Sequence, residues 1–380
     1  MKVSKGYKVE LKLNNKQKTM LLRHAGAARY AYNWGLRKRI DLYEKEKKST
    51  NAIEQHRELN KEKQSTLAWM YQSSKAAPQE ALRDLDRAFQ NFFRNIKQGR
   101  KPGFPKFKSK KNGIGSFRLT GSIHVESNRI KLPRIGWVKL KEEDRLPIVT
   151  PSQVTVREKA GHWFVSFNIQ EEVQEQKISD KVIGVDLGIN HLATLSDGTK
   201  YENPKPLKKK LQKLRRLSKS LSRKVKGSKN RQKAREQLAR LHYKIANIRK
   251  DCLHKITTEI ARTKPSVVVL EDLGVSNIMK NRKLSRSIQD AGFYEFRRQL
   301  EYKLSWIGSK IEFVDRFFPS SKTCSSCGAI KKELSLSERQ YDCEVCGQCI
   351  DRDENAAINL MKAASSAVLA CGDIVRPQRA

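Results

Sequence analysis

The sequence lacks any long hydrophobic run. No stretch approaches the roughly 18 to 20 apolar residues that a bilayer-spanning helix needs. Residues 1–13 alternate in polarity and lack the apolar centre of a signal peptide. We therefore expect a cytoplasmic protein with no membrane partner. In that compartment the seven cysteines predict metal binding or free thiols, and a disulfide framework is excluded.

Acidic residues are scarce relative to basic ones. The chain of 380 residues carries 79 Lys and Arg against 40 Asp and Glu, which gives a formal net charge of +39. A polyanion has to neutralise such a charge, so nucleic acid is the expected partner, ahead of a ribosomal or anionic-membrane role. The hydrophobic content of 38% predicts folded structure, and the length allows two or three domains.

The first half of the sequence changes between strand and helix patterns. Residues 6–13 alternate with period two and predict a strand, whereas apolar residues at helical spacing predict helices over 14–48 and 77–96. Several short strands follow over 115–175, with a hairpin turn at Ala160–Gly161. These strands predict a small β-barrel. We expect the first strand to join it, which makes the helical block an insertion.

Residues 205–250 form a strongly basic amphipathic segment. Nineteen Lys and Arg stand against one acidic residue, Glu236, and leucines recur at spacings of three and four. The pattern predicts a long helix or a helix pair with a break near Gly227. An ordinary solvated helix mixes both charge signs, so we expect this segment to contact a nucleic-acid backbone. The candidate contacts are Lys208, Lys209, Arg215, Arg216 and Arg223.

Four cysteines form two pairs of the pattern CxxC, Cys324 with Cys327 and Cys343 with Cys346, separated by fifteen residues. This spacing is typical of zinc sites in which two tight turns bring four sulfurs around the ion. Four protein ligands leave no open position for a substrate, so the predicted zinc is structural. Cys349 forms an overlapping CxxC and could replace Cys346, but the paired spacing favours Cys346.

Three carboxylates stand at positions where an apolar strand or helix has little structural use for them. Asp186 lies in "VIGVD", Glu271 follows "VVVL", and Asp353 precedes "ENAAINL". Carboxylates from two strands and one helix can converge on two Mg²⁺ ions, or Mn²⁺, for phosphodiester hydrolysis. The alternatives are local roles: a turn at Asp186, an arginine partner for Glu271, and a helix N-cap at Asp353.

The motifs "GVDLGINHLATLSDG", "LEDL" and "DRDENAAIN" resemble those of a RuvC-like nuclease, which has the ribonuclease H fold. The chain is also similar to TnpB, the family of RNA-guided nucleases of insertion sequences and a relative of compact type V CRISPR effectors. The similarity lies in the cysteine segment between the second and third motifs, in residues 281–303, and in "ARYAYNWGL" and "GFPKFKSKK" of the N-terminal half. By this resemblance Asp186, Glu271 and Asp353 match the catalytic carboxylates, with Asp353 preferred to Asp351. The four paired cysteines match a zinc ribbon.

The resemblance implies an α+β multidomain fold. Its expected parts are a wedge-like β-barrel (1–14 and 106–180), an inserted helical recognition domain (15–105), a RuvC-like α/β nuclease domain (181–320 and 350–376), an inserted zinc ribbon that binds target nucleic acid (321–349) and a tail (377–380).

The resemblance also implies a function. A guide RNA from the transposon end would pair with one strand of double-stranded DNA, and the protein would read only a short flanking motif. Lys75, Gln79 and Thr120 are the candidates for reading that motif, and we expect one protein chain on one RNA. The alternatives are a non-cleaving regulator or accessory transposition factor, which the three intact carboxylates disfavour, and a strand-transferring transposase.

Overall fold

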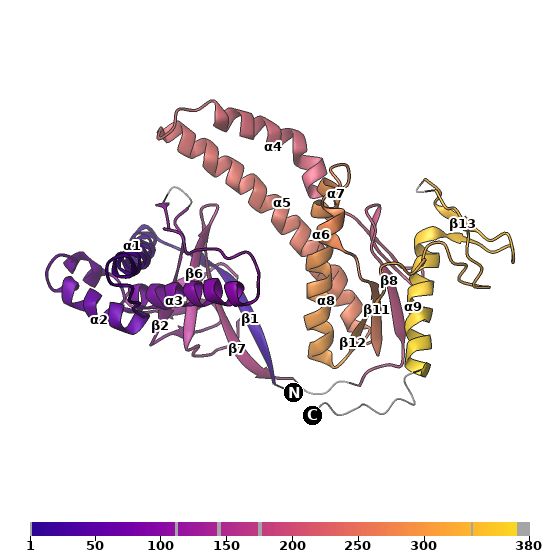
Figure 1. Ribbon diagram of the computed structural model, residues 1–380, viewed down its shortest axis with the longest axis horizontal. Coiled ribbons are helices and arrows are strands. Elements are labelled where there is room, and N and C mark those ends of the chain that lie inside the picture. Colours follow the sequence, from indigo (N-terminus) through magenta and orange to yellow (C-terminus); the bar gives the residue numbers. More distant parts are fainter. Residues whose placement is uncertain (1, 111–112, 143–145, 174–176, 336, 371–380) are drawn as a thin grey trace. The chain divides into compact units, whose positions relative to one another are not determined.

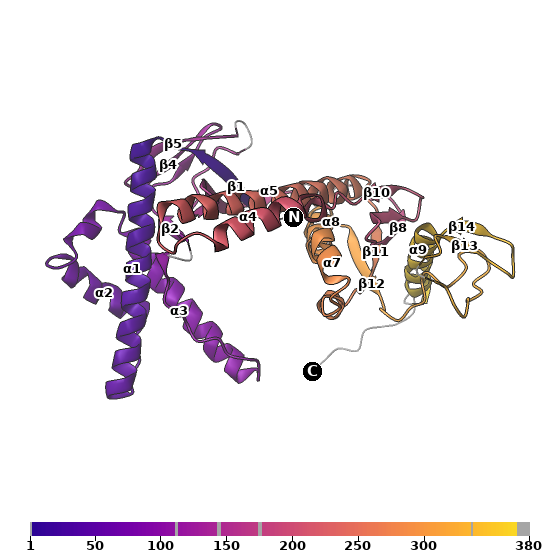
Figure 2. The ribbon, with the colours of Figure 1, turned by 90° about the horizontal axis from the view of Figure 1, so that it is seen from above.

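The structure is a computed structural model of the whole chain (Figures 1 and 2), and it describes residues 2–110, 113–142, 146–173, 177–335 and 337–370. The chain divides into two compact units between Glu171 and Glu172. We call them the N-terminal unit and the C-terminal unit. Within the described residues, no helix is both long enough and apolar enough to cross a membrane.

The N-terminal unit contains a seven-stranded sheet with the order β2-β6-β7-β1-β5-β4-β3. Its strands are β1 (Lys2–Lys12), β2 (Ser116–Thr120), β3 (His124–Val125), β4 (Arg129–Leu132), β5 (Gly136–Leu140), β6 (Gln153–Lys159) and β7 (His162–Glu172). As predicted, the first strand belongs to this sheet, and a tight turn joins β6 to β7. Ala160 and Gly161 have φ values of 56° and 88°, which two-residue hairpins of type I′ require. The strand order ends at β2 and β3, so closure into the predicted barrel stays a prediction.

The helices of this unit all lie between β1 and β2 in sequence. They are α1 (Asn15–Glu46), α2 (Ala52–Lys63), the 3₁₀ helix η1 (Ala68–Gln72) and α3 (Ala76–Lys97). Asn14 and Gln17 form a capping box at the start of α1. Helices α1 and α3 cross closely (Figure 2). Gly35 allows this approach, since a Cβ at its position would lie only 2.6 Å from Cδ2 of Leu82.

Helices and strands of the N-terminal unit share one core. Leu21 and Leu85 from the helices belong to the same buried cluster as Leu119 and Val156 from the strands. The ring of His24 in α1 also stacks on Phe117 in β2, with centroids 5.3 Å apart. The inserted helical block is therefore packed on the sheet and has no separate core.

The C-terminal unit is built on a five-stranded sheet with the order β10-β9-β8-β11-β12. The strands are β8 (Val182–Asp186), β9 (His191–Leu195), β10 (Lys200–Glu202), β11 (Val267–Glu271) and β12 (Lys310–Val314). Strand β11 runs parallel to β8 and to β12, and β8, β9 and β10 are antiparallel neighbours. The centre of β11 is buried on both faces, which explains its unbroken apolar run.

Helices cover both faces of this sheet. On one face α5 (Lys229–Arg262) and α8 (Phe293–Ile307) pack against Val268 and Leu270, and on the other α9 (Arg352–Ala370) packs against Val267 and Val269. Figure 1 shows the sheet between α8 and α9. In sequence, α4 (Pro206–Ser222) lies between β10 and β11, and α6 (Val275–Ile278) and α7 (Ser285–Ala291) lie between β11 and β12. A small pair of strands, β13 (Gln340–Asp342) and β14 (Cys349–Asp351), precedes α9. The finer domain boundaries stay predictions, and residues 371–380, with the predicted tail, lie outside the described residues.

Candidate metal centres

The three predicted carboxylates lie on elements that come together at one edge of the C-terminal sheet. Asp186 ends β8 and Glu271 ends β11, and these parallel strands are in register with Leu270 opposite Val185. Asp353 lies in the first turn of α9. Burial raises the pKa of Asp186 to about 7, and the nearby charges of Asp353 and Glu271 add to this increase. Asp186 therefore lies within electrostatic range of both Asp353 and Glu271.

Glu271 has no arginine partner among the described residues. The two nearby guanidinium groups bind the next residue instead: Nη1 of Arg297 and Nη2 of Arg316 lie 3.0 Å and 3.1 Å from the carboxylate oxygens of Asp272. Burial raises the pKa of Glu271. The alternative role of Glu271 in an ion pair is therefore wrong.

The helix N-cap is Asp351 and not Asp353. Oδ1 of Asp351 accepts hydrogen bonds from the backbone N–H groups of Asp353 and Glu354, at 3.0 Å and 3.2 Å. Its Oδ2 lies 2.8 Å from Nζ of Lys200. Both carboxylate oxygens of Asp351 thus have partners. The carboxylate of Asp353 is not used to cap α9 and remains available to bind a ligand. The alternative reading of Asp353 as the N-cap is wrong.

His191 is a neighbour of this cluster that the sequence reasoning missed. Its Nδ1 lies 4.0 Å from Oδ2 of Asp353, and this buried nitrogen has no hydrogen-bond partner among the described residues. His191 begins β9, the antiparallel neighbour of β8. A histidine at the start of a strand that pairs with the Asp186 strand is the signal that could have revealed it.

Small residues bring α9 against the sheet. A Cβ on Gly184 would lie 2.0 Å from the carbonyl oxygen of Ala357 and 2.7 Å from the backbone nitrogen of Met361. Ala356 and Ala357 are themselves buried. Because Asp353 precedes Ala357 by about one helical turn, this close contact holds Asp353 near the end of β8, where Asp186 lies.

The four paired cysteines form a compact sulfur cluster. The Sγ atoms of Cys324, Cys327, Cys343 and Cys346 all lie within 4.8 Å of one another. The two CxxC turns match, since the N–H of Gly328 donates to the carbonyl of Cys324 and that of Gly347 to the carbonyl of Cys343, each at 3.0 Å. Both glycines have positive φ, 77° and 71°.

The cysteine cluster has the chemistry of a metal site. Backbone N–H groups of Cys346 and Val345 lower the pKa of Cys343 to about 6, which favours the thiolate that metal ions bind. Cys349 lies on β14 and is no part of the cluster. Among the described residues, no other set of three or more His, Cys, Asp and Glu side chains brings its ligand atoms this close together.

Two asparagines that the sequence reasoning missed connect the cysteine cluster to α9. Nδ2 of Asn355 donates to the carbonyl of Thr323 at 2.7 Å, and its Oδ1 accepts from the N–H of Ser325 at 2.9 Å. Nδ2 of Asn359 donates to the carbonyls of Ser320 and Thr323 at 2.8 Å and 2.7 Å. Both side chains are buried. The turn around Cys324 is therefore fixed to the helix that carries Asp353.

Comparison with known proteins gives matches along the whole length of the chain. Three family models match, described as "Probable transposase" over residues 155–282, "Cas12f1-like, TNB domain" over 293–360 and "Helix-turn-helix domain" over 1–48. A protein of Streptomyces pristinaespiralis named "Putative RNA-guided DNA endonuclease" is 37% identical over 99% of this chain and 93% of its own. The similarly named InsQ of Escherichia coli K12 is 36% identical over 100% of this chain and 96% of its own.

This chain belongs to the TnpB family. The resemblance inferred from the motifs is thereby confirmed. Among solved structures, Cas12f1 in a complex with single-guide RNA and target DNA has the same fold as this TnpB chain, with a TM-score of 0.58 and 17% identity over 95% of this chain and 99% of that one.

The basic segment of this TnpB chain forms a helical hairpin of α4 and α5, broken between Ser222 and Lys229 near the predicted Gly227 (Figure 1). Buried Asp290 of α7 fixes its start by accepting from the N–H groups of Leu207 and Lys208. The five candidate backbone contacts are exposed and form no ion pair with any described residue; they are Lys208, Lys209, Arg215, Arg216 and Arg223.

The three candidates for reading a flanking motif lie on two elements that contact each other. Lys75 is exposed at the start of α3, Gln79 is half-buried in its first turn, and Thr120 ends β2. Helix α3 and β2 are joined by Arg118, whose Nη2 lies 3.2 Å from Glu80 and 2.6 Å from Asp84.

Proposed function

We propose that this protein is an RNA-guided DNA endonuclease, which binds a guide RNA and cleaves matched double-stranded DNA beside a short flanking motif. The observation that carries the proposal is the placement of three carboxylates at one sheet edge: Asp186 and Glu271 end two paired parallel strands, and Asp353 starts the helix that packs on β8. The relatives of matching length carry that name. A protein that only binds nucleic acid has no need of three carboxylates at one site beside phosphates.

The carboxylate cluster is proposed to hold divalent cations, Mg²⁺ or Mn²⁺. The residues fit such ions, because oxygen donors suit them and because Glu271 has no cationic side chain as a partner among the described residues. When bound, two such ions stabilise the attacking and leaving oxygens in phosphodiester hydrolysis. Asp351 caps α9 and so positions Asp353. The mixed sheet with β8 and β11 at its centre supports a RuvC-like assignment for this unit.

The cysteine cluster is proposed to hold a structural Zn²⁺. Four sulfurs around one centre match the closed coordination of structural zinc. The surrounding segment, with β13 and β14, would then be a zinc ribbon that contacts target nucleic acid. Its hydrogen bonds to Asn355 and Asn359 would let a structural metal help position a catalytic residue.

The basic surfaces are proposed to bind the guide and the target. Five exposed basic side chains of the α4–α5 hairpin form no ion pair with any described residue and suit phosphate contacts; they are Lys208, Lys209, Arg215, Arg216 and Arg223. In the N-terminal unit the sheet would be the wedge and the helical block the recognition domain, with Lys75, Gln79 and Thr120 reading the flanking motif. One chain on one RNA, acting in the prokaryotic cytoplasm, completes the proposal.

The test is to purify the protein from cells that express the matching transposon end and to sequence any bound RNA. We expect an RNA of defined length and Mg²⁺-dependent cutting of DNA that matches it. Asp186→Ala should lose cutting by about 10³-fold or more, as expected when a metal ligand is removed, and keep RNA and DNA binding. The matched control is Asp251→Ala, at an exposed residue of α5. RNA-guided binding without cutting by the wild-type protein would favour the regulator, and joined DNA ends would favour the transposase.

A further inference from the structure

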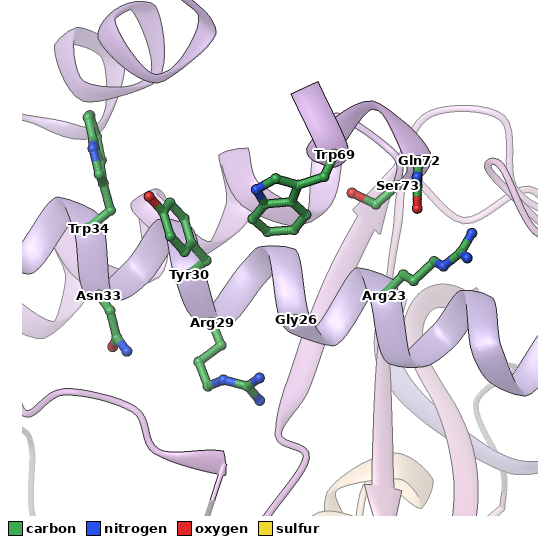
Figure 3. A pocket seen from close by; sticks show the side chains of 9 residues that line it. All are labelled: Arg23, Gly26, Arg29, Tyr30, Asn33, Trp34, Trp69, Gln72 and Ser73. Carbon is green, nitrogen blue, oxygen red and sulfur yellow. The ribbon is translucent and has the colours of Figure 1, made fainter. Parts of the chain in front are cut away.

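The N-terminal unit contains a pocket of about 580 Å³. The residues that line it have no role in the proposed nuclease activity described above. Its lining comes from α1, from Trp69 and Gln72 of η1, and from Ser73, which follows η1 (Figure 3). The volume falls within the roughly 300 to 1,000 Å³ that is typical of small-ligand sites.

Two aromatic rings form one side of this pocket. Tyr30 and Trp69 meet edge to face, with centroids 5.5 Å apart and planes at 88°. Their side chains are 39% and 42% exposed, although large aromatic rings usually lie in a core. Figure 3 shows both rings on the same side of α1. Aromatic faces that are open to solvent in a strongly basic protein are surfaces on which nucleic-acid bases stack.

Gly26 leaves open space beside these rings. It lies inside α1, where glycine weakens a helix relative to alanine, yet a Cβ at Gly26 would meet no atom within 4 Å. Gly35 in the same helix differs, because its Cβ would collide with Leu82. Packing therefore requires Gly35 and does not require Gly26. The space above Gly26 (Figure 3) lets a flat ligand lie close to the helix backbone.

The pocket also offers polar groups without partners. The guanidinium of Arg23 and the amide of Gln72 are exposed and form no hydrogen bond or ion pair with any described residue. Other lining groups are already engaged: Asn33 exchanges hydrogen bonds with the backbone of Lys108, and Nε1 of Trp34 donates to Glu62. The guanidinium of Arg23 thus remains available to bind a phosphate group, and the amide of Gln72 remains available to bind the edge of a nucleic-acid base.

We propose that this pocket binds one unpaired nucleotide of a nucleic-acid strand. Its base stacks on Tyr30 or Trp69 above Gly26, its phosphate contacts Arg23, and Gln72 contacts the base edge. The strand is either the guide RNA or DNA separated from its complement, because both present the same base and phosphate. The inference relies on the proposed function only in that it takes nucleic acid as the ligand.

The first test measures the affinity of the purified full chain for single-stranded RNA and DNA oligonucleotides and for the matching duplexes, by fluorescence anisotropy at high salt. High salt weakens phosphate contacts more than stacking. Trp69→Ala should weaken single-strand binding about 5- to 150-fold, the range that corresponds to loss of one stacked base. Gly26→Leu should do the same by filling the space. Tyr71→Ala is the matched control, since Tyr71 is an exposed aromatic residue of η1 outside the pocket.

The second test identifies the source of the nucleotide. Ultraviolet cross-linking of the guide complex, with and without target DNA, should join the peptide that contains Tyr30 or Trp69 to RNA in both samples, or to DNA only in the second. Unchanged single-strand affinity of folded Trp69→Ala and Gly26→Leu would overturn the proposal. Equal losses for single strands and duplexes would overturn it too, because a duplex has no unpaired base to insert. Failure of guided cleavage with pocket-dependent oligonucleotide binding would contradict the proposed nuclease and leave this site standing.

Discussion

Nδ2 of Asn355 lies 2.7 Å from the carbonyl oxygen of Thr323. Thr323 directly precedes the first cysteine of the sulfur cluster, and Asn355 follows Asp353 by two residues. One side-chain amide therefore joins the proposed zinc site to the helix that carries a proposed catalytic carboxylate. The motif "DRDENAAIN" thus combines three roles: Asp351 caps the helix, Asp353 supplies one of the three carboxylates, and Asn355 and Asn359 hold the cysteine turn.

Replacing Asn355 tests this connection. Asn355→Ala leaves the buried N–H of Ser325 without its partner, whereas the carbonyl of Thr323 keeps its hydrogen bond from Asn359. A buried unsatisfied group typically reduces stability by about 1–3 kcal/mol. We expect a lower melting temperature, measured by calorimetry, and slower guided cleavage. Asn247→Ala is the control, because Asn247 is exposed on α5. A fully active Asn355→Ala protein would show that Asp353 is positioned without the amide.

Features that depend on local periodicity could be predicted from the sequence. The alternation of residues 6–13 and the apolar run of β11 gave their strands, and the spacing of two CxxC pairs gave the sulfur cluster. Asp186 and Glu271 could be found because a carboxylate at the end of an apolar strand is unusual. The polar helix α2 was missed, since few of its residues are buried and its sequence has no continuous apolar face.

Features that depend on long-range packing could not be predicted. Asn355 and Asn359 are ordinary polar residues until the cysteine turn, more than thirty residues earlier in sequence, is placed against α9. The same holds for Asp290, which fixes the start of a helix 83 residues away. His191 is different: its place at the start of β9 is a local signal, and only its distance of 4.0 Å from Asp353 depends on packing. Each of these contacts joins elements that are far apart in the sequence, and no local pattern reports which elements pack together.

Zinc removal tests the role of the cysteine cluster. Cys343→Ser removes one of the four sulfurs, and we expect loss of the bound zinc, measured as moles of metal per chain, with reduced cleavage and a largely intact N-terminal unit. Cys349→Ser is the matched control and should keep its zinc, because Cys349 lies outside the cluster. Zinc retained by Cys343→Ser and lost by Cys349→Ser would reverse the ligand assignment.

The contact between β8 and α9 predicts a strict size limit at Gly184. Gly184→Ala places a Cβ 2.0 Å from the carbonyl oxygen of Ala357, so the helix has to move. Overpacking of this kind typically destabilises a protein by about 1–3 kcal/mol, and a shift of α9 also displaces Asp353. We expect a lower denaturation midpoint in urea together with slower cleavage. Gly103→Ala, whose Cβ would meet nothing within 4 Å, should change stability by less than about 0.5 kcal/mol.

The burial of Asp186, together with the nearby carboxylates, predicts that its charge destabilises the metal-free protein at neutral and alkaline pH. Its pKa is raised in the folded state from 3.8 to about 7, so the folded protein binds an extra proton between these values. The contribution of this proton to the free energy of unfolding is fully present below pH 4 and is lost as the pH rises through 7. Asp186→Asn should therefore raise the melting temperature in chelator at pH 8 and have little effect at pH 4. A lower melting temperature at pH 8 would contradict the repulsion.

The same carboxylate predicts pH-dependent metal binding. A divalent cation binds the ionised form of Asp186, so the proton and the metal compete below pH 7. With a pKa of about 7, the ionised fraction is about one tenth at pH 6 and about nine tenths at pH 8, and the apparent Mn²⁺ affinity should be about tenfold weaker at pH 6. Calorimetric titration in two buffers of different ionisation enthalpy measures both the affinity and the released proton.

The Asp186→Asn protein should bind Mn²⁺ weakly, with a smaller change in affinity between the two pH values. An equally large pH dependence in that variant would show that another group carries the proton, and His191, 4.0 Å from Asp353, is the first to replace.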